Sequence, residues 1–323
     1  MSLIPFIISF LTVIFFVPII IRFGKKFNFL DLPDSRKVNK IPTVRLGGVA
    51  IYIGIILGIF FQLISGINMH QQYDLVLVRS FLITTSLIFF IGLIDDIYNI
   101  SPLFRLFSQI VISSSIWKFG VKISSLDLSF LGFNESIELS TTLSWCISVL
   151  WITGLINAIN WLDGIDGLAV GIAFISACGI SIISYLLGNL FVSGLGIILA
   201  GATLAFLIFN IRPHKIIMGD CGSNLLGYIL ALLSILGLSS SKDVNLNQIE
   251  FRILTSGLIF LIPIFDMAKT IAVRLINQSS PFLPDKNHLH HFLLSKGFSI
   301  IQTTTIICSF SLVSNSIAIL TIM

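Results

Sequence analysis

Apolar runs long enough to cross a lipid bilayer recur along most of this 323-residue chain. A bilayer core about 30 Å thick needs roughly 20 consecutive apolar residues in a helix, so each run predicts one membrane-spanning helix. Only 11% of the residues are charged, against about 25% in soluble domains, which excludes a soluble fold. We therefore predict an all-α polytopic membrane protein that forms one multi-pass domain over residues 1–323. About ten spans are predicted, with approximate bounds 3–22, 47–64, 79–94, 103–118, 145–159, 168–187, 191–210, 222–238, 252–274 and 301–321.

Lysine and arginine are distributed unequally between the two sides that these spans define. The first span has neither the preceding basic residues nor the small-residue cleavage site of a signal peptide, so we expect a retained helix with its N-terminus outside. In that orientation 14 of the 19 basic residues fall in inner segments, as the positive-inside rule requires. The net charge of +4 then needs no nucleic-acid partner. The four cysteines stand apart without a CxxC pair, which predicts free thiols.

A polar stretch, Asn157–Gly167, directly follows one of the apolar runs. Its side chains Asn157, Asn160, Asp163 and Asp166 recur every three residues, so on a helix each would lie about one turn from the next. A carboxylate at the bilayer centre costs about 2.5–3.5 kcal/mol, so the stretch predicts a polar cavity at a helix end. The alternative is a helix C-terminus that emerges into water through ordinary turn residues.

Two further polar groups fall at span ends on the same, inner side. Asp95 and Asp96 end the third span, and adjacent carboxylates usually imply a shared proton or cation. Arg105 follows near the start of the next span, within reach of the same place. The turn 219–223, Gly-Asp-Cys-Gly-Ser, opens a helix and would suit a metal-bound phosphate beside backbone N–H groups. Taken alone, each group could also be an exposed turn.

The inner loops add basic residues and histidines. The segment 22–48 is the longest basic stretch, and it predicts either a positive-inside anchor or a loop that attracts a phosphorylated ligand. His288, His290 and His291 have no Cys or Glu at ligand spacing, which favours hydrogen bonds to phosphate or sugar over zinc binding. Asp266 lies one turn from Lys269, which allows a buried structural ion pair as well as a catalytic role. Together these groups have the composition of a Mg²⁺–diphosphate site. On the outer side, alternating residues after Phe119 predict a short β-hairpin.

Four motifs in order resemble those of the polyprenyl-phosphate N-acetylhexosamine-1-phosphate transferases of glycosyltransferase family 4. They are Asp95-Asp96 with Asn99, the stretch Asn157–Gly167, the turn 218–223 and the histidines 288–291. The resemblance implies Mg²⁺-dependent transfer, with Mn²⁺ as a substitute, of N-acetylhexosamine 1-phosphate from a UDP-sugar to undecaprenyl or another polyprenyl phosphate. UMP would be released at the cytoplasmic face of the plasma membrane, at the start of cell-envelope glycan synthesis.

The loop 281–291 resembles the WecA/TagO-type branch of the family and favours UDP-N-acetylglucosamine (UDP-GlcNAc) as donor. The alternative within the family is an MraY-type phospho-MurNAc-pentapeptide transferase. An alternative from another class is a proton-coupled transporter that uses intramembrane aspartates. A transporter would favour inverted repeats and helices broken at the midplane, whereas the carboxylates gather at one face and no internal repeat is evident. The sequence leaves open whether the protein is a homodimer.

The resemblance also assigns roles to individual residues. It implies that Asp220 is the main metal ligand with Asn160 as the second, and that Asp95 and Asp96 position and deprotonate the lipid phosphate. The substrate-binding residues that it implies are Lys40, Arg105, Asn157, Asp163, Asp166, Asn210, His288, His290 and His291. Two positions depart from the family pattern: Asn39 stands where histidine is usual, and Arg105 stands where lysine is common, which keeps the charge but changes its geometry.

Overall fold

The structure is a computed structural model that describes residues 2–31, 41–66, 75–132, 136–211, 216–238, 250–278 and 287–323. Within these ranges eight helices are long and apolar enough to cross a membrane, which confirms an all-α polytopic membrane protein. They are α1 (Ile4–Lys26), α2 (Gly47–Ile64), α3 (Leu75–Tyr98), α5 (Thr141–Leu162), α6 (Leu168–Leu186), α7 (Leu190–Asn210), α8 (Gly219–Gly237) and α12 (Ile300–Leu320).

Two of the ten predicted spans form helices that are too short to be counted among these eight membrane-spanning candidates. Helix α4 (Pro102–Lys118) has 17 residues, about 26 Å of helix against a bilayer core of about 30 Å. The predicted span 252–274 is wrong as a single helix, because the chain forms α9 (Ile253–Ile259) and α10 (Leu261–Ile276) with a break at Phe260. Pro263 explains the break, since it lacks an N–H group and its ring opposes the carbonyl of Ile259, four residues earlier.

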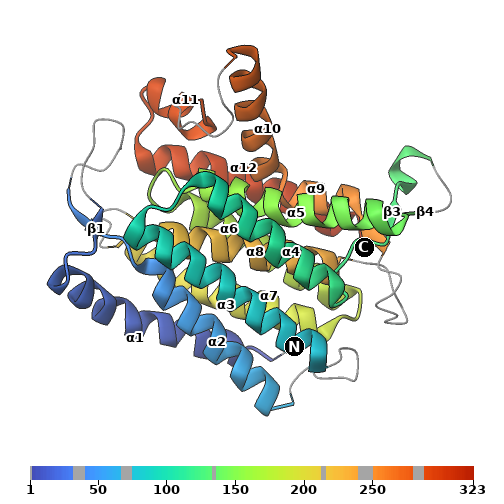
Figure 1. Cartoon of the computed structure of the whole chain (residues 1–323), viewed down its shortest axis with the longest axis horizontal. Helices are drawn as coiled ribbons and strands as arrows, with labels where there is room; N and C mark the ends of the chain where they lie inside the picture. The colour runs from blue at the N-terminus through green and yellow to red at the C-terminus, as the bar shows by residue number, and fades with distance from the viewer. Residues whose placement is uncertain are drawn as a thin grey trace.

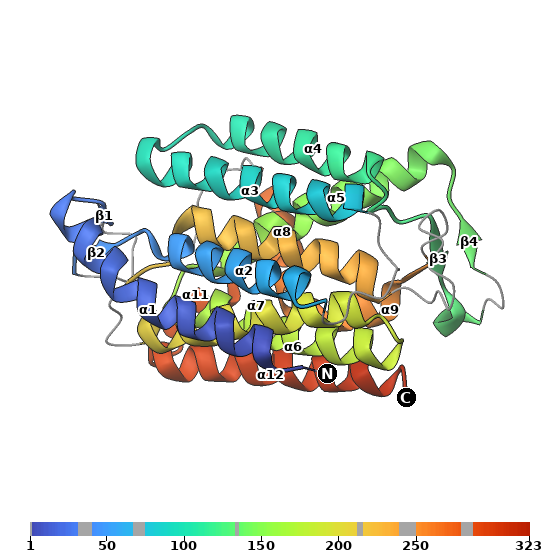
Figure 2. The same cartoon turned by 90° about the horizontal axis from the view of Figure 1, so that it is seen from below.

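Helix α8 lies at the centre of the bundle (Figures 1 and 2), where it packs against α2, α3, α5 and α6. In its most apolar 18-residue window 94% of the residues are buried, against 28% for α1. A helix that is apolar on all sides is buried either in protein or in lipid, and α8 is buried in protein. The N-terminal turn of α8 carries Asp220, so the most enclosed helix of the protein presents a carboxylate at one end.

Small sheets lie at the two opposite ends of the bundle (Figures 1 and 2). At one end β1 (Leu30–Asp31) pairs antiparallel with β2 (Thr43–Val44). At the other, β3 (Ser125–Asp127) pairs antiparallel with β4 (Ile137–Glu138), which confirms the predicted hairpin. A third strand, β5 (Glu250–Arg252), joins β3 in parallel. The sheet thus links two segments that are far apart in the sequence.

Helices α10 and α11 (Leu289–Ser295) project from one side of the bundle, above α12 in Figure 1. Helix α11 packs against α12, and α10 contacts α5 and α12. The break at Phe260 therefore lets α10 leave the direction of the spanning helices. As a result the histidine segment that begins α11 is brought to the end of α5.

Candidate active site

The core of the site is the contact between the end of α3 and the start of α8. The Asp96 carboxylate accepts hydrogen bonds from the backbone N–H groups of Asp220, at 2.8 Å, and Cys221, at 2.9 Å. These donors are free because the first N–H groups of a helix have no partner within it. The two helices can approach so closely because position 92 is glycine: an added Cβ would lie 2.6 Å from the Cα atom of Cys221.

Two arginines neutralise part of the charge of three aspartates at this contact. The Arg45 Nε atom lies 2.9 Å from an Asp96 oxygen, and its Nη2 atom pairs with Asp220. The Arg105 Nη1 atom lies 2.5 Å from Asp95 and 3.7 Å from Asp220. The structure thus brings together four of the predicted site residues: Asp95, Asp96, Arg105 and Asp220.

Arg45 is the site residue that the sequence did not single out. It lies between β2 and α2, in a segment where it is one of several basic residues that also fit a positive-inside anchor. The signal that could have identified it is its position two residues before the paired glycines Gly47 and Gly48. Burial alone would lower the pKa of Arg45, but Asp220 and Asp96 outweigh it and raise the pKa above its ordinary value.

The two asparagines of α5 have different environments. The Asn160 Nδ2 atom donates to Asp220 at 2.5 Å and to the Ser223 hydroxyl at 2.8 Å, so Asn160 belongs to the site. The Asn157 Nδ2 atom donates to Gln109 on α4 at 2.7 Å and to the Thr153 carbonyl at 2.8 Å. The structure therefore places Asn157 in the packing between α4 and α5, one helical turn before Asn160.

Beyond Asn160 the predicted one-per-turn helical spacing is wrong, because α5 ends at Leu162. Asp163 and Asp166 lie in the loop before α6, where Gly167 adopts a left-handed φ of 77°. Burial and the nearby Asp220 carboxylate raise the pKa of Asp163 well above its usual range. Asn210 holds this loop, since its Oδ1 atom accepts from the Gly167 N–H at 2.9 Å and its Nδ2 atom donates to the Ile216 carbonyl at 2.9 Å.

The three histidines form a stack beside the same loop. The rings of His288 and His290 lie 5.6 Å apart at 8° to one another, and those of His290 and His291 lie 4.3 Å apart. An added Cβ at Gly164 would lie 2.5 Å from the His290 Nε2 atom. The residue following Asp163 must therefore be small for the stack to reach the loop.

Asp266 pairs with His288 and not with Lys269, which excludes one of the two alternatives that the sequence left open. The His288 Nδ1 atom lies 2.7 Å from Asp266, whereas the Lys269 ammonium lies over the Phe292 ring at 5.7 Å from its centroid. One helical turn separates Asp266 from Lys269 in sequence, but the two side chains turn to different neighbours. Lys40, which was predicted to bind substrate, and Asn39 lie outside the described residues.

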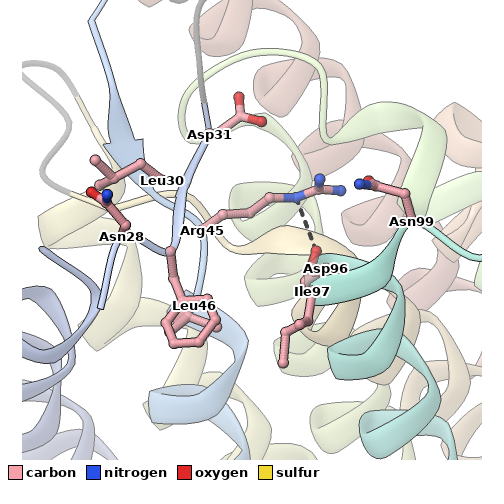
Figure 3. A pocket seen from close by; sticks show the side chains of 9 residues that line it. Asn28, Leu30, Asp31, Arg45, Leu46, Asp96, Ile97 and Asn99 are labelled. Atoms are coloured by element: carbon pink, nitrogen blue, oxygen red, sulfur yellow. Dashed lines mark ion pairs between the residues drawn. The ribbon is translucent and has the colours of Figure 1, made fainter. Parts of the chain in front are cut away.

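A polar pocket of about 330 Å³ opens beside the paired arginine and aspartate. Figure 3 shows Arg45 extending across it towards Asp96 and Asn99. Asn28 and Asp31 line the opposite wall. The pocket gives a ligand access to Arg45 from the side of β1.

The carboxylates around Asp220 fit a divalent cation. Three carboxylates, those of Asp95, Asp96 and Asp220, face two described guanidinium groups, which leaves an excess of one negative charge. Carboxylate and amide oxygens are the ligands that Mg²⁺ prefers. In the described residues no three His, Cys, Asp or Glu side chains already surround one position. A bound ion would thus rely on Asp220, on the Asn160 amide oxygen after rotation of that amide, whose nitrogen faces Asp220 here, and on oxygens of its substrate.

Known proteins resemble this chain over most of its length. Residues 78–238 match glycosyl transferase family 4. A probable undecaprenyl-phosphate N-acetylglucosaminyl 1-phosphate transferase from Bacillus subtilis (strain 168) is 36% identical over 296 residues, which cover 92% of this chain and 78% of the relative. The chain belongs to glycosyl transferase family 4. The family predicted from the four motifs is thereby confirmed.

Other relatives carry the same kind of name within glycosyl transferase family 4. A decaprenyl-phosphate N-acetylglucosaminephosphotransferase from Mycobacterium leprae is 34% identical over 285 residues, 83% of this chain and 70% of the relative. An undecaprenyl-phosphate alpha-N-acetylglucosaminyl 1-phosphate transferase from Escherichia coli (strain K12) is 27% identical over 305 residues, 93% and 78% of the two chains. Each relative is thus named as a polyprenyl-phosphate transferase of N-acetylglucosamine phosphate.

Burial of His290 leads to a prediction about the pH dependence of stability. Burial, followed by His291 and His288, lowers the pKa of His290 to about 3, against about 6.5 in an unfolded chain. Between these values the unfolded state binds a proton that the folded state rejects, so His290 lowers stability as pH drops below about 6.5. The raised pKa of Asp163 acts in the opposite direction, so the contribution of His290 is measured as a difference from His290→Phe. We expect the apparent melting temperature of the wild type in detergent to fall relative to that of His290→Phe from pH 7 to pH 5, and equal slopes would contradict the assignment.

Proposed function

We propose that this protein transfers N-acetylglucosamine 1-phosphate from UDP-GlcNAc to a polyprenyl phosphate such as undecaprenyl phosphate. The observation that carries the proposal is the set of carboxylates and arginines around Asp220, at the end of a fully enclosed helix. Such a site suits two phosphorylated substrates, and the relatives are named for this transfer. An oxygen of the lipid phosphate attacks the β-phosphorus of the donor, the bond from that phosphorus to the bridging oxygen breaks, and UMP leaves with that oxygen.

Different residues of the site would contribute to different parts of this displacement. Mg²⁺ held by Asp220 and Asn160 would neutralise negative charge on the donor diphosphate. Arg45 and Arg105 bind phosphate oxygens and keep the attacking and leaving groups in line, since positioning and charge stabilisation supply most of the catalysis of phosphoryl transfer. Asp95, which is paired with Arg105, is placed to orient the lipid phosphate. A phosphate monoester is already mostly ionised at pH 7, with a second pKa of about 6, so no strong base is required.

We further propose that the protein lies in the plasma membrane and that its site is on the cytoplasmic side. Two observations support this orientation. The last turn of α1 carries Lys25 and Lys26, and Figures 1 and 2 place that end of α1 beside β1, away from β3 and β4. Basic residues therefore gather at the end that holds Asp220, as expected for a cytoplasmic surface.

The direct test uses purified protein with undecaprenyl phosphate and Mg²⁺, and it follows UMP release. We expect release with UDP-GlcNAc only when the lipid phosphate is present. Release with UDP-MurNAc-pentapeptide alone would assign the protein to the MraY-type reaction. No release from a panel of UDP-N-acetylhexosamines would contradict the proposed function and favour the transporter.

Removal of divalent cations provides a separate prediction. We expect EDTA to lower the rate to the background level, because the excess negative charge around Asp220 would repel a diphosphate. Added Mg²⁺ should restore the rate fully and Mn²⁺ in part, since both accept oxygen ligands. The control measures by calorimetry whether the protein still binds UMP in the presence of EDTA. Full activity in excess EDTA would exclude a role for an exchangeable metal.

A further inference from the structure

A stripe of three polar residues runs along α10 and is buried, although this helix leaves the bundle. Asp266, Thr270 and Arg274 are spaced four residues apart, so they lie on one face of the helix. They are 1%, 0% and 4% exposed. Buried polar groups need partners, and the stripe finds them in the histidine segment and at the end of α5.

Asp266 uses both of its carboxylate oxygens at the start of α11. One oxygen accepts from His288 Nδ1 at 2.7 Å, and the other accepts from the Leu289 N–H at 2.6 Å. The Thr270 hydroxyl lies 3.3 Å from the same Nδ1 atom. A carboxylate can only accept from a neutral imidazole, so this contact places the ring proton on Nδ1. The other nitrogen, Nε2, is then an acceptor in the neutral ring and a donor in the protonated ring.

The His288 ring is also linked to the charged cluster through Trp161. The two rings contact edge to face with centroids 5.9 Å apart, and the Arg274 guanidinium lies over the Trp161 ring at 4.8 Å. Trp161 directly follows Asn160, whose amide donates to Asp220. One face of α10 thus contacts both His288 and Trp161, which is the neighbour of the amide that donates to Asp220.

We propose that Asp266 is a positioning residue for the transfer reaction. It fixes His288 in the tautomer that carries its proton on Nδ1, so that Nε2 can accept from a sugar hydroxyl group of the bound donor. The inference rests on the proposed function and extends it by one residue. A carboxylate behind a histidine sets the orientation of the ring and the identity of the reactive nitrogen. A merely structural Asp266 would instead serve only to begin α11.

The first test is Asp266→Asn, compared with Lys269→Met on the same helix. We expect Asp266→Asn to lower kcat for UMP release about 10–100-fold, the usual effect of removing such a partner, with little change in KM. Lys269→Met should stay within about two-fold of wild type, because Lys269 contacts Phe292 and not His288. The double variant Asp266→Asn/His288→Ala should be no slower than His288→Ala alone, since residues that act as a unit are not additive. Multiplied losses would overturn the proposal.

A second variant separates positioning from folding. The side-chain nitrogen of His288→Asn can replace Nδ1 as a donor to Asp266, but the variant has no counterpart of Nε2. We expect it to melt like wild type and to be as inactive as His288→Ala. Wild-type activity of His288→Asn would overturn the proposal and leave Asp266 with a structural role only.

Nitrogen chemical shifts report the tautomer directly. The chain has five histidines, so selective ¹⁵N-histidine labelling gives few signals, and His288→Ala identifies those of residue 288. We expect a protonated Nδ1 in the wild type and a changed Nδ1/Nε2 pattern in Asp266→Asn. An unchanged pattern with unchanged kcat would refute the positioning role, whereas wild-type protein that releases no UMP would refute the proposed function itself.

Discussion

Asp220→Ala is expected to lower UMP release at least about 10³-fold while the protein remains folded and inserted in the membrane. Arg45, Arg105 and Asn160 all converge on this carboxylate. Its removal would eliminate the main candidate metal ligand and would leave the donor diphosphate without its counter-charge, an electrostatic contribution that commonly dominates such catalysis. The measurement is the initial rate of UMP release at saturating UDP-GlcNAc.

The matched control for this variant is Asp127→Ala. Asp127 lies in β3, at the opposite end of the bundle, where its side chain accepts from the Ser129 N–H at 2.9 Å. We expect its loss to leave the rate unchanged. Substantial activity in Asp220→Ala, together with a normal melting temperature, would mean that the metal and the diphosphate are held elsewhere.

Asp96→Ala is expected to cause the largest loss of stability, in contrast to Asp95→Ala beside it. The Asp96 side chain is 1% exposed and is bound by two backbone N–H groups of α8 and by Arg45. Its loss would leave all three donors without this acceptor, and each buried donor that is left unsatisfied costs about 1–3 kcal/mol. We expect the apparent melting temperature in detergent to fall by several degrees and activity to be lost as well.

Asp95→Ala serves as the comparison for this effect. Among the described contacts its carboxylate pairs with one side chain, Arg105, and accepts from no backbone N–H group of α8. Its loss should therefore reduce activity with a smaller change in melting temperature. Equal melting temperatures for the two alanine variants would contradict the role of Asp96 in holding the start of α8.

The sequence was sufficient to predict the class of fold and the end of the bundle at which the polar groups meet. Asp95, Asp96, Arg105 and Asp220 were identified correctly as neighbours because each ends or begins an apolar run on the inner side. This prediction uses only the fact that charged groups are unfavourable in the apolar core of the bilayer. It also predicted the short hairpin, because alternating residues in a polar segment are a local signal.

Contacts between residues that are distant in the sequence could not be predicted in this way. Asn157, which is predicted to bind substrate, donates to Gln109, 48 positions earlier. Helical spacing allowed a pair of Asp266 with Lys269 as one of two alternatives, whereas the partner of Asp266, His288, lies 22 positions later. Arg45 was one of many basic residues until the fold placed it between Asp96 and Asp220. Local pattern predicts which segments meet, and packing decides which side chains touch.

The complete enclosure of α8 has a consequence for substitutions far from the site. Gly227 lies midway along this helix, and an added Cβ there would meet the Ile156 backbone at 2.7 Å. A larger residue at this position could be accommodated only if α8 shifted relative to α5. Because Asp220 lies in the first turn of α8 and Asn160 lies in the last turn of α5, such a shift would separate the two proposed metal ligands. The proposed metal site would therefore depend partly on steric fit in the apolar core, about two helical turns from Asp220.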